Sequence, residues 1–159
     1  MITNINTNEF TVLDLTDLPD LTSMYYESYW KEIDNYVLNG FSVGDVKVTG
    51  KHFFYLNLWN IYGTPLGASR KTIIRPRFLE LDFELFNSHD LAYKLFKDEL
   101  WYKSRQIGGS EKLAAIAAYE YTIYNASQSV IVAGEKEYSE HTMSNVLRGL
   151  NDLASTPYY

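Results

Sequence analysis

Two stretches in the first hundred residues carry apolar side chains at helical spacing. The first runs from about Leu21 to Leu38 and is followed by Asn39 and Gly40, a pair that favours the left-handed turn at a helix end. Its apolar positions are Met24, Tyr25, Trp30, Ile33, Tyr36 and Val37. The second, from Glu80 to Lys97, has its stripe at Leu81, Leu85, Phe86, Leu91, Leu95 and Phe96, with acidic residues early and lysines late. The spacing predicts a helix in each stretch.

The segment from Phe41 to about Phe78 has a β-rich pattern instead. Its strand-forming positions are Val46, Val48, the aromatic run Phe53, Phe54 and Tyr55, and Thr72, Ile73 and Ile74. Turn residues punctuate it at Gly44, Gly50, Gly63 and Pro65. We therefore expect several short strands here, with the aromatic run among them.

The second half reads as strand, turn, helix, strand, helix. Leu100 to Tyr102 forms a short apolar strand, and Lys103 to Gly109 a glycine-containing turn. A sequence of high helix propensity starts at Ser110 and breaks at residues 125–127. The continuous apolar run from Val130 to Ala133 is typical of a buried parallel strand. Apolar positions from Thr142 to Leu153 predict a last amphipathic helix, so the pattern as a whole predicts an α/β fold with a βαβ unit.

Composition narrows the possible functions. The 159 residues suit one ordinary domain, and 46% hydrophobic with 21% charged residues are globular values. Fourteen basic and 20 acidic residues give a net charge of −6, so any contact with nucleic acid must be local or shared with other chains. Without cysteine, a disulfide framework, a thiolate nucleophile and a cysteine zinc site are excluded. A polar start and the lack of 18 consecutive apolar residues predict neither secretion nor a membrane span.

The turn before the predicted helix at Ser110 partly matches a P-loop, GxxxxGK[ST]. In the window from Lys103 to Ser110, Gly108 takes the sixth position and Ser110 the eighth, whereas Gly109 stands where lysine is expected. Glycines let backbone amides approach phosphate, the serine can reach Mg²⁺, and Lys103 or Arg105 must then supply the positive charge. Taken alone, the spacing fits a glycine-rich helix start better than a phosphate site.

Three segments in order resemble one family, the large terminase subunits of tailed phages. KSRQIGGSEKLAAIAAYEYTIY is similar to their deviant Walker A segment and its Ala-rich helix. Upstream, NGFSVGDVKVTGKHFFYLNLWNI resembles a segment that ends in an aromatic run and YLN, and downstream SVIVAGEKEYSEHTMSNVL resembles the second strand and helix of the same ATPase. Together they span about Asn39 to Leu150.

This resemblance implies the N-terminal part of a P-loop ATPase that packages viral DNA. Residues 1–98 would form the helix and β-rich segment leading into the ATPase, and residues 99–159 its first βαβ half. The resemblance places the nucleotide-loop positions at Arg105, Gln106, Gly108, Gly109 and Ser110, with Lys103 as a second cation and Ser110 on Mg²⁺. It implies ATP and Mg²⁺ as cofactors. The implied partners are double-stranded viral DNA, the portal protein, the small terminase subunit and further copies in a ring, in the host cytoplasm and without a membrane.

Parts of the family pattern have no counterpart. A Walker B acid is not recognisable, since Glu135 follows what matches the second strand, and no nuclease acids are present before Tyr159. Tyr55 or Asn57 is a guess for the adenine contact. We therefore expect a piece of a terminase large subunit, incomplete as a catalyst alone. The alternative is a non-enzymatic interaction module that retains a degenerate P-loop scaffold.

Several other residues have a structural explanation as well as a functional one. Glu80, Asp82 and Glu84 alternate like a carboxylate cluster but suit a solvated helix face better. His52, His89 and His141 show no metal-ligand spacing. The aromatic run, with Trp59, could stack bases but more often forms a core. Lys71, Arg75 and Arg77, next to Arg70, form the best local basic stripe. This stripe fits a contact with DNA or with a neighbouring subunit's nucleotide, and it fits a solvated face with salt bridges equally well.

Overall fold

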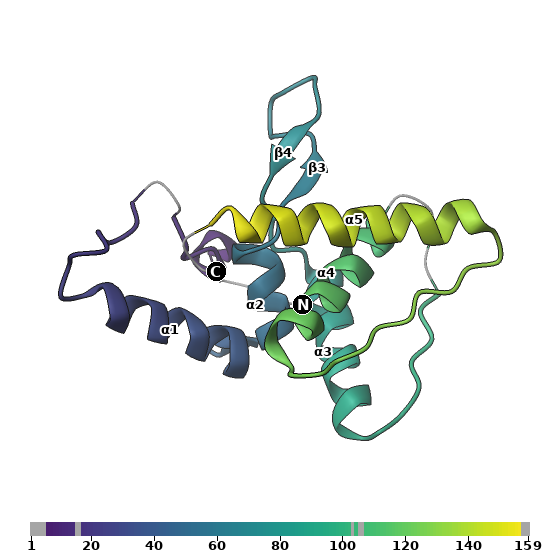
Figure 1. Cartoon of the computed structure of the whole chain (residues 1–159), viewed down its shortest axis with the longest axis horizontal. Helices are drawn as coiled ribbons and strands as arrows, with labels where there is room; N and C mark the ends of the chain where they lie inside the picture. The colour runs from purple at the N-terminus through teal and green to yellow at the C-terminus, as the bar shows by residue number, and fades with distance from the viewer. Residues whose placement is uncertain (1–5, 15–16, 103, 105–106, 157–159) are drawn as a thin grey trace. The chain divides into compact units, whose positions relative to one another are not determined.

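Contacts divide the chain into two compact units, each made from two stretches of sequence. The computed structural model describes residues 6–14, 17–102, 104 and 107–156. Unit 1 comprises Met1–Leu58 and Arg77–Leu100, and unit 2 comprises Trp59–Pro76 and Trp101–Tyr159 (Figure 1). Both helices and short strands occur, as the sequence predicts, and the strands pair in antiparallel fashion. No helix in the described ranges has the length and apolar character needed to cross a membrane.

The described part of unit 1 contains a 3₁₀ turn, three helices and one hairpin. Its elements are η1 (Thr7–Phe10), α1 (Tyr26–Asn39), β1 (Phe41–Val43), β2 (Val46–Val48), α2 (Gly50–Asn57) and α3 (Glu80–Lys94). The predicted helices at α1 and α3 are confirmed. Gly40 ends α1 at φ +85°, and a Cβ there would lie 2.2 Å from the Val48 carbonyl oxygen, so only glycine fits.

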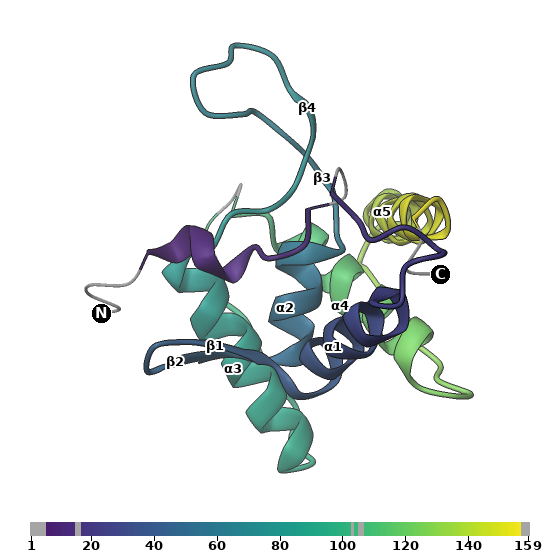
Figure 2. The ribbon, with the colours of Figure 1, turned by 90° about the vertical axis from the view of Figure 1, so that its left-hand side faces the viewer.

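The aromatic run at Phe53 is helix α2, and its prediction as a strand is wrong. The Thr49 hydroxyl accepts the His52 amide and caps the helix, and Gly50 lets it approach α1 closely. Figure 2 shows α2 between α1 and α3. Every residue of α2 is buried. A helix covered on all sides has no polar face, so its sequence lacks the periodicity that distinguishes helix from strand.

The core of unit 1 is aromatic and is fixed by one buried amide. Phe10 stacks on Phe78 with 4.7 Å between ring centroids, and His52 stacks on Phe86 at 4.8 Å. Asn57 in α2 accepts the amides of residues 12 and 13, at 2.8 and 3.1 Å, and donates to the carbonyls of residues 10 and 53. These four bonds use its full capacity and hold the N-terminal segment against α2.

Unit 2 is built on two packed helices and a hairpin. Its elements are β3 (Ile61–Gly63), β4 (Thr72–Ile74), α4 (Gly109–Ile123) and α5 (Lys136–Ala154). Strand β4 and both helices are confirmed predictions. Trp59 is fully buried, and its ring occupies the space beside Gly149, where a Cβ would lie 2.0 Å away. The interface of α5 therefore depends on the missing side chain at Gly149.

The two predicted parallel strands of this half do not form in the described residues. Neither 100–102 nor 130–133 is part of a sheet, and the sheets present are two antiparallel pairs, β1 with β2 and β3 with β4. Val130 and Val132 are 75% and 85% exposed. Parallel strands are stable where neighbouring strands and helices on both faces bury them, and within the described ranges no strand pairs with either segment. The βαβ unit is thus not confirmed.

Candidate nucleotide-binding site

The turn that leads into α4 contains a left-handed glycine directly before the helix. Gly108 adopts the left-handed conformation, at φ +72° and ψ +21°, and no side chain of the described residues caps the helix. The first intrahelical bond runs from the Lys112 amide to the Gly108 carbonyl at 3.1 Å. The amides of Gly109, Ser110 and Glu111 therefore have no acceptor within the helix, and they face the end where the dipole is positive.

Three of the predicted loop residues are described and three are not. Gly108 is exposed, Gly109 is buried and Ser110 is partly buried at the start of α4. The structure thus places these residues in one uncapped helical turn. Lys103, Arg105 and Gln106 lie outside the described residues.

Lys112 brings a positive charge to this turn that the sequence analysis missed. The residue is 98% buried, and its ammonium donates to the Ile107 carbonyl. The same nitrogen lies 3.5 Å from the place of a Cβ on Gly108. A lysine four residues after the left-handed glycine can fold back over the first helical turn, and that spacing is the signal that could have identified it.

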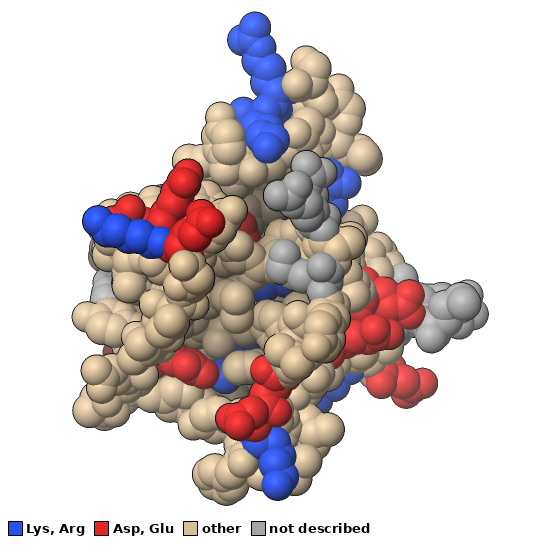
Figure 3. Space-filling model, turned by 90° about the vertical axis from the view of Figure 1, so that its right-hand side faces the viewer, with Lys and Arg blue, Asp and Glu red and all other residues tan. Residues whose placement is uncertain are grey.

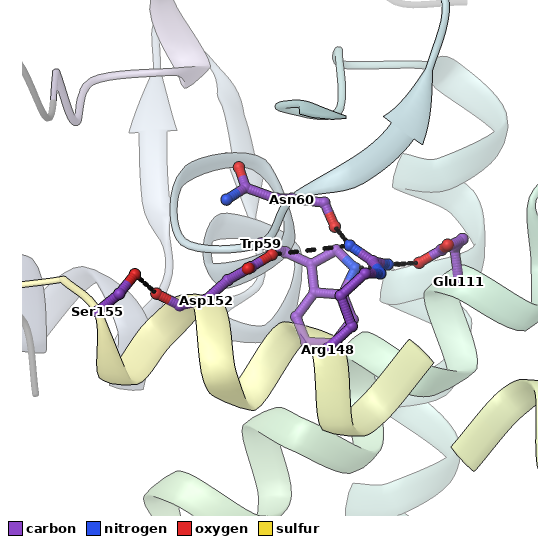
Figure 4. Close-up of polar contacts among 6 residues, drawn as sticks. All are labelled: Trp59, Asn60, Glu111, Arg148, Asp152 and Ser155. Carbon is purple, nitrogen blue, oxygen red and sulfur yellow. Dashed lines mark hydrogen bonds and ion pairs between the residues drawn. The ribbon is translucent and has the colours of Figure 1, made fainter. Parts of the chain in front are cut away.

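A second charged group balances the acid in the first turn of α4. Figure 4 shows the Arg148 guanidinium from α5 between the Glu111 carboxylate and the Asn60 carbonyl, at 2.8 and 2.6 Å. Trp59 donates its indole N–H to the same carboxylate at 3.4 Å. A carboxylate at a helix N-terminus would repel an incoming phosphate, and the ion pair reduces that repulsion.

A cavity of about 550 Å³ opens beside Ser110. It is lined by Ser110 and Glu120 of α4, by Val130 and Val132, and by Tyr138 and His141 of α5. A smaller apolar cavity of about 290 Å³ lies between the same two helices, bounded by Ile131 and Leu147. Both are lined by the 129–131 segment, so α4, α5 and this segment do not pack to a closed core.

The carboxylates give little support for a bound metal ion. Within the described residues, no three groups of the histidine, aspartate and glutamate type gather as a metal site. Glu135 is exposed at the start of α5. Glu80 and Glu84 are exposed on α3, as a solvated face predicts, but Asp82 is buried. Among the residues that the structure describes, the Ser110 hydroxyl at the start of α4 suits a role beside Mg²⁺, an ion that keeps several waters and phosphate oxygens as ligands.

His52 and the aromatic run serve in packing, whereas His89 lies among charged groups and His141 is exposed. His52 is fully buried in the core of unit 1. His89 lies with Nε2 at 3.0 Å from the Lys51 ammonium and Nδ1 at 3.0 Å from the Glu99 carboxylate. The run from Phe53 to Tyr55 and Trp59 are at most 4% exposed, which confirms their interpretation as core and not as a base-stacking platform. Asn57, whose four hydrogen bonds are all used, leaves nothing for an adenine.

The basic stripe predicted for one strand face is divided in the structure. Strand β4 includes only Thr72–Ile74, so Lys71 and Arg75 flank it, and Arg77 belongs to the other unit. Arg70 and Lys71 are exposed in the loop before β4. The basic face is therefore confined to the β3/β4 hairpin.

Comparisons with known proteins found no match, so a function must be inferred from the chain's own residues. No family model matches the sequence, no curated protein matches it, and no solved structure matches its fold.

Proposed function

We propose that this chain is the N-terminal part of a terminase large subunit and binds ATP at the start of α4. The observation that carries the proposal is the uncapped left-handed turn at Gly108, which coincides with the segment resembling the family's Walker A loop. This loop has two consecutive glycines, and three of its amides have no carbonyl acceptor within the helix. Both features suit the binding of a chain of phosphates.

Each residue of the site has a defined role in this proposal. The amides of Gly109 and Ser110 donate to phosphate oxygens, and the Ser110 hydroxyl holds Mg²⁺ with the nucleotide. Lys112, buried behind the turn, adds positive charge without leaving its carbonyl partner. Arg105, with Lys103 as the second cation, neutralises the outer phosphates, and Gln106 contacts the nucleotide. Bound ATP with Mg²⁺ supplies the phosphoryl group whose transfer drives movement of DNA.

The wider assembly follows from the same proposal. The subunit acts with further copies in a ring, contacts the portal protein and the small terminase subunit, and moves double-stranded viral DNA in the host cytoplasm. A Walker B acid is not recognisable in the sequence, so we expect weak nucleotide binding and little turnover from this chain alone.

Titration of a fluorescent ATP analogue into the full chain, with and without Mg²⁺, tests the site. We expect Mg²⁺-dependent binding that Arg105→Ala weakens by about tenfold or more, since a charge-assisted phosphate contact contributes about 1.5 to 3 kcal/mol. Ser110→Ala should remove the Mg²⁺ dependence. Ser144→Ala, at an exposed serine of α5, is the matched control.

The second candidate is a non-enzymatic interaction module on the same scaffold. The exposed Val130 and Val132 favour it, because the strands that should enclose a nucleotide loop are not paired. Absence of Mg²⁺-dependent ATP binding by the folded chain would support this module and reject the ATPase.

A further inference from the structure

The β3/β4 hairpin concentrates positive charge in an acidic chain. Residues 59–76 contain Arg70, Lys71 and Arg75 and no aspartate or glutamate, while the whole chain has a net charge of −6. Figure 3 shows lysine and arginine side chains at the top of the molecule, where the hairpin lies. A segment of this kind gives a local positive field that the total charge does not indicate.

The two cations in the loop have no acidic partner. Arg70 and Lys71 are exposed, and neither takes part in any ion pair within the described part of the chain. Three other exposed lysines, Lys31, Lys94 and Lys136, instead pair with an acid four residues away. Arg70 and Lys71 are therefore available to an external anion.

The hairpin also presents apolar groups on the face of Lys71. Tyr62 and Ile73 are directly opposite in the register and are 62% and 56% exposed. Lys71 precedes Ile73 by two positions and shares its face. At the tip, Leu66 is 88% exposed. Figure 1 shows the hairpin standing clear of α4 and α5, the helices of its own unit.

We infer that the β3/β4 hairpin is an arm that binds duplex DNA through its backbone phosphates. A two-stranded antiparallel ribbon fits the major groove, where its edges lie near the phosphates of both strands. Arg70 and Lys71 bind phosphate oxygens, and Tyr62 with Ile73 contacts sugars and bases without reading sequence. The choice of duplex DNA among polyanions rests on the proposed function; the site itself rests on the hairpin.

The expected binding is weak and strongly dependent on salt. Each phosphate neutralised on B-DNA contributes about −0.9 to the slope of log K against log salt. Loss of both Arg70 and Lys71 should therefore reduce the magnitude of the slope by about 1.8. A contact that is sequence-independent should respond equally on duplexes of unrelated sequence.

Fluorescence anisotropy with a 30-base-pair duplex, at several NaCl concentrations and without nucleotide, tests the arm. Arg70→Ala combined with Lys71→Ala should weaken binding at low salt by about tenfold or more and flatten the slope. The matched control, Lys31→Ala with Lys136→Ala, removes the same charge from α1 and α5 and should keep the slope. All four positions are exposed, so circular dichroism should show unchanged folding for both variants.

Three results would overturn the inference. The hairpin variant could keep the wild-type slope. Alternatively, the control variant could lose as much affinity as the hairpin variant, which would mean that net charge alone causes the effect. Poly-glutamate of equal charge could displace the labelled duplex from the hairpin as well as unlabelled duplex DNA does, and this result would indicate that the ligand is an acidic protein. Because no nucleotide is added, failure here leaves the ATP titration unchanged, and failure of the ATP titration leaves the arm in place.

Discussion

The two units of this protein differ in how completely they bury their apolar residues. In unit 1, every residue of α2 is buried, and aromatic rings from several elements close around it. In unit 2, α4 and α5 pack together, yet Val130 and Val132 are exposed and two cavities lie along the same segment. Helix α2 is therefore buried by the elements of its own unit. The apolar segment 130–133 would need neighbouring strands to bury it, and the described part of unit 2 has none beside it.

The largest contrast should come from comparing one apolar truncation in each unit. Phe53→Ala removes a fully buried ring that packs on Tyr36 and Phe41, and it should lower the free energy of unfolding by about 3 to 5 kcal/mol. Val132→Ala, at a side chain 85% exposed, should change it by less than about 0.5 kcal/mol. Chemical denaturation measures both. A cost above 1 kcal/mol at Val132 would mean that this segment is buried in solution and would remove the contrast between the units.

A glycine on α5 tests the part of unit 2 that is well packed. Gly149→Ala places a methyl group 2.0 Å from the Trp59 ring and should destabilise by about 1 to 3 kcal/mol, because the indole must move. Gly134→Ala is the control, since nothing lies within 4 Å of a Cβ there. Thermal melting separates the two, and equal melting temperatures would show that Trp59 is not seated against α5.

The ion pair between Arg148 and Glu111, beside the candidate site, should contribute less to the free energy of unfolding. A double-mutant cycle with Arg148→Met and Glu111→Gln should give a coupling energy of about 1 kcal/mol, because both side chains are about one-quarter exposed. The same cycle on Lys136 and Glu140, which are far more exposed, should give about 0.3 kcal/mol. Equal coupling in the two cycles would show that Arg148 does not hold Glu111 more firmly than a surface pair.

The smallest expected effect is a pH dependence of the free energy of unfolding that originates in α1 of unit 1. The Tyr36 hydroxyl donates to the Glu32 carboxylate, and this hydrogen bond, followed by burial and the negative charge, raises the pKa of Tyr36 above its usual 10.0. Because the pKa is raised in the folded state, the hydrogen bond contributes fully to the free energy of unfolding below pH 10. This contribution is lost as the pH rises through the folded-state pKa.

Tyr36→Phe should therefore be slightly less stable than wild type at pH 8, by less than about 1 kcal/mol, and the difference should shrink above pH 10. Tyr62→Phe, at an exposed tyrosine, is the control. Urea denaturation from pH 8 to 11 measures both, and a constant difference would exclude the hydrogen bond as the cause.

The sequence predicted the helices better than the strands. The stripes in α1 and α3 each combine an apolar face with a polar one, so spacing alone identified them, and Gly40 marked the first helix end. Phe53 and its neighbours were misassigned because burial on all sides removes that contrast. The run from Val130 to Ala133 has strand-like composition, but composition does not supply the partners that a sheet needs.

For the candidate site, the sequence predicted the helix start at Gly108, Gly109 and Ser110 but not the charges around it. Lys112 is one helical turn beyond Gly108, yet only the fold shows that its ammonium returns to the Ile107 carbonyl. Arg148 lies 37 residues from Glu111, and no local pattern links the two. Long-range pairs depend on how helices pack, which a linear motif does not encode.

By itself, the sequence determined the amphipathic helices, the glycine turn before α4 and the charge imbalance of residues 59–76, because each depends on neighbours within a few positions along the chain. The tertiary structure alone decided that an aromatic run is a central helix, that two apolar segments have no sheet to join, and that Lys112 and Arg148 face the start of α4. Those outcomes depend on burial and on partners distant in sequence, and packing in three dimensions fixes both.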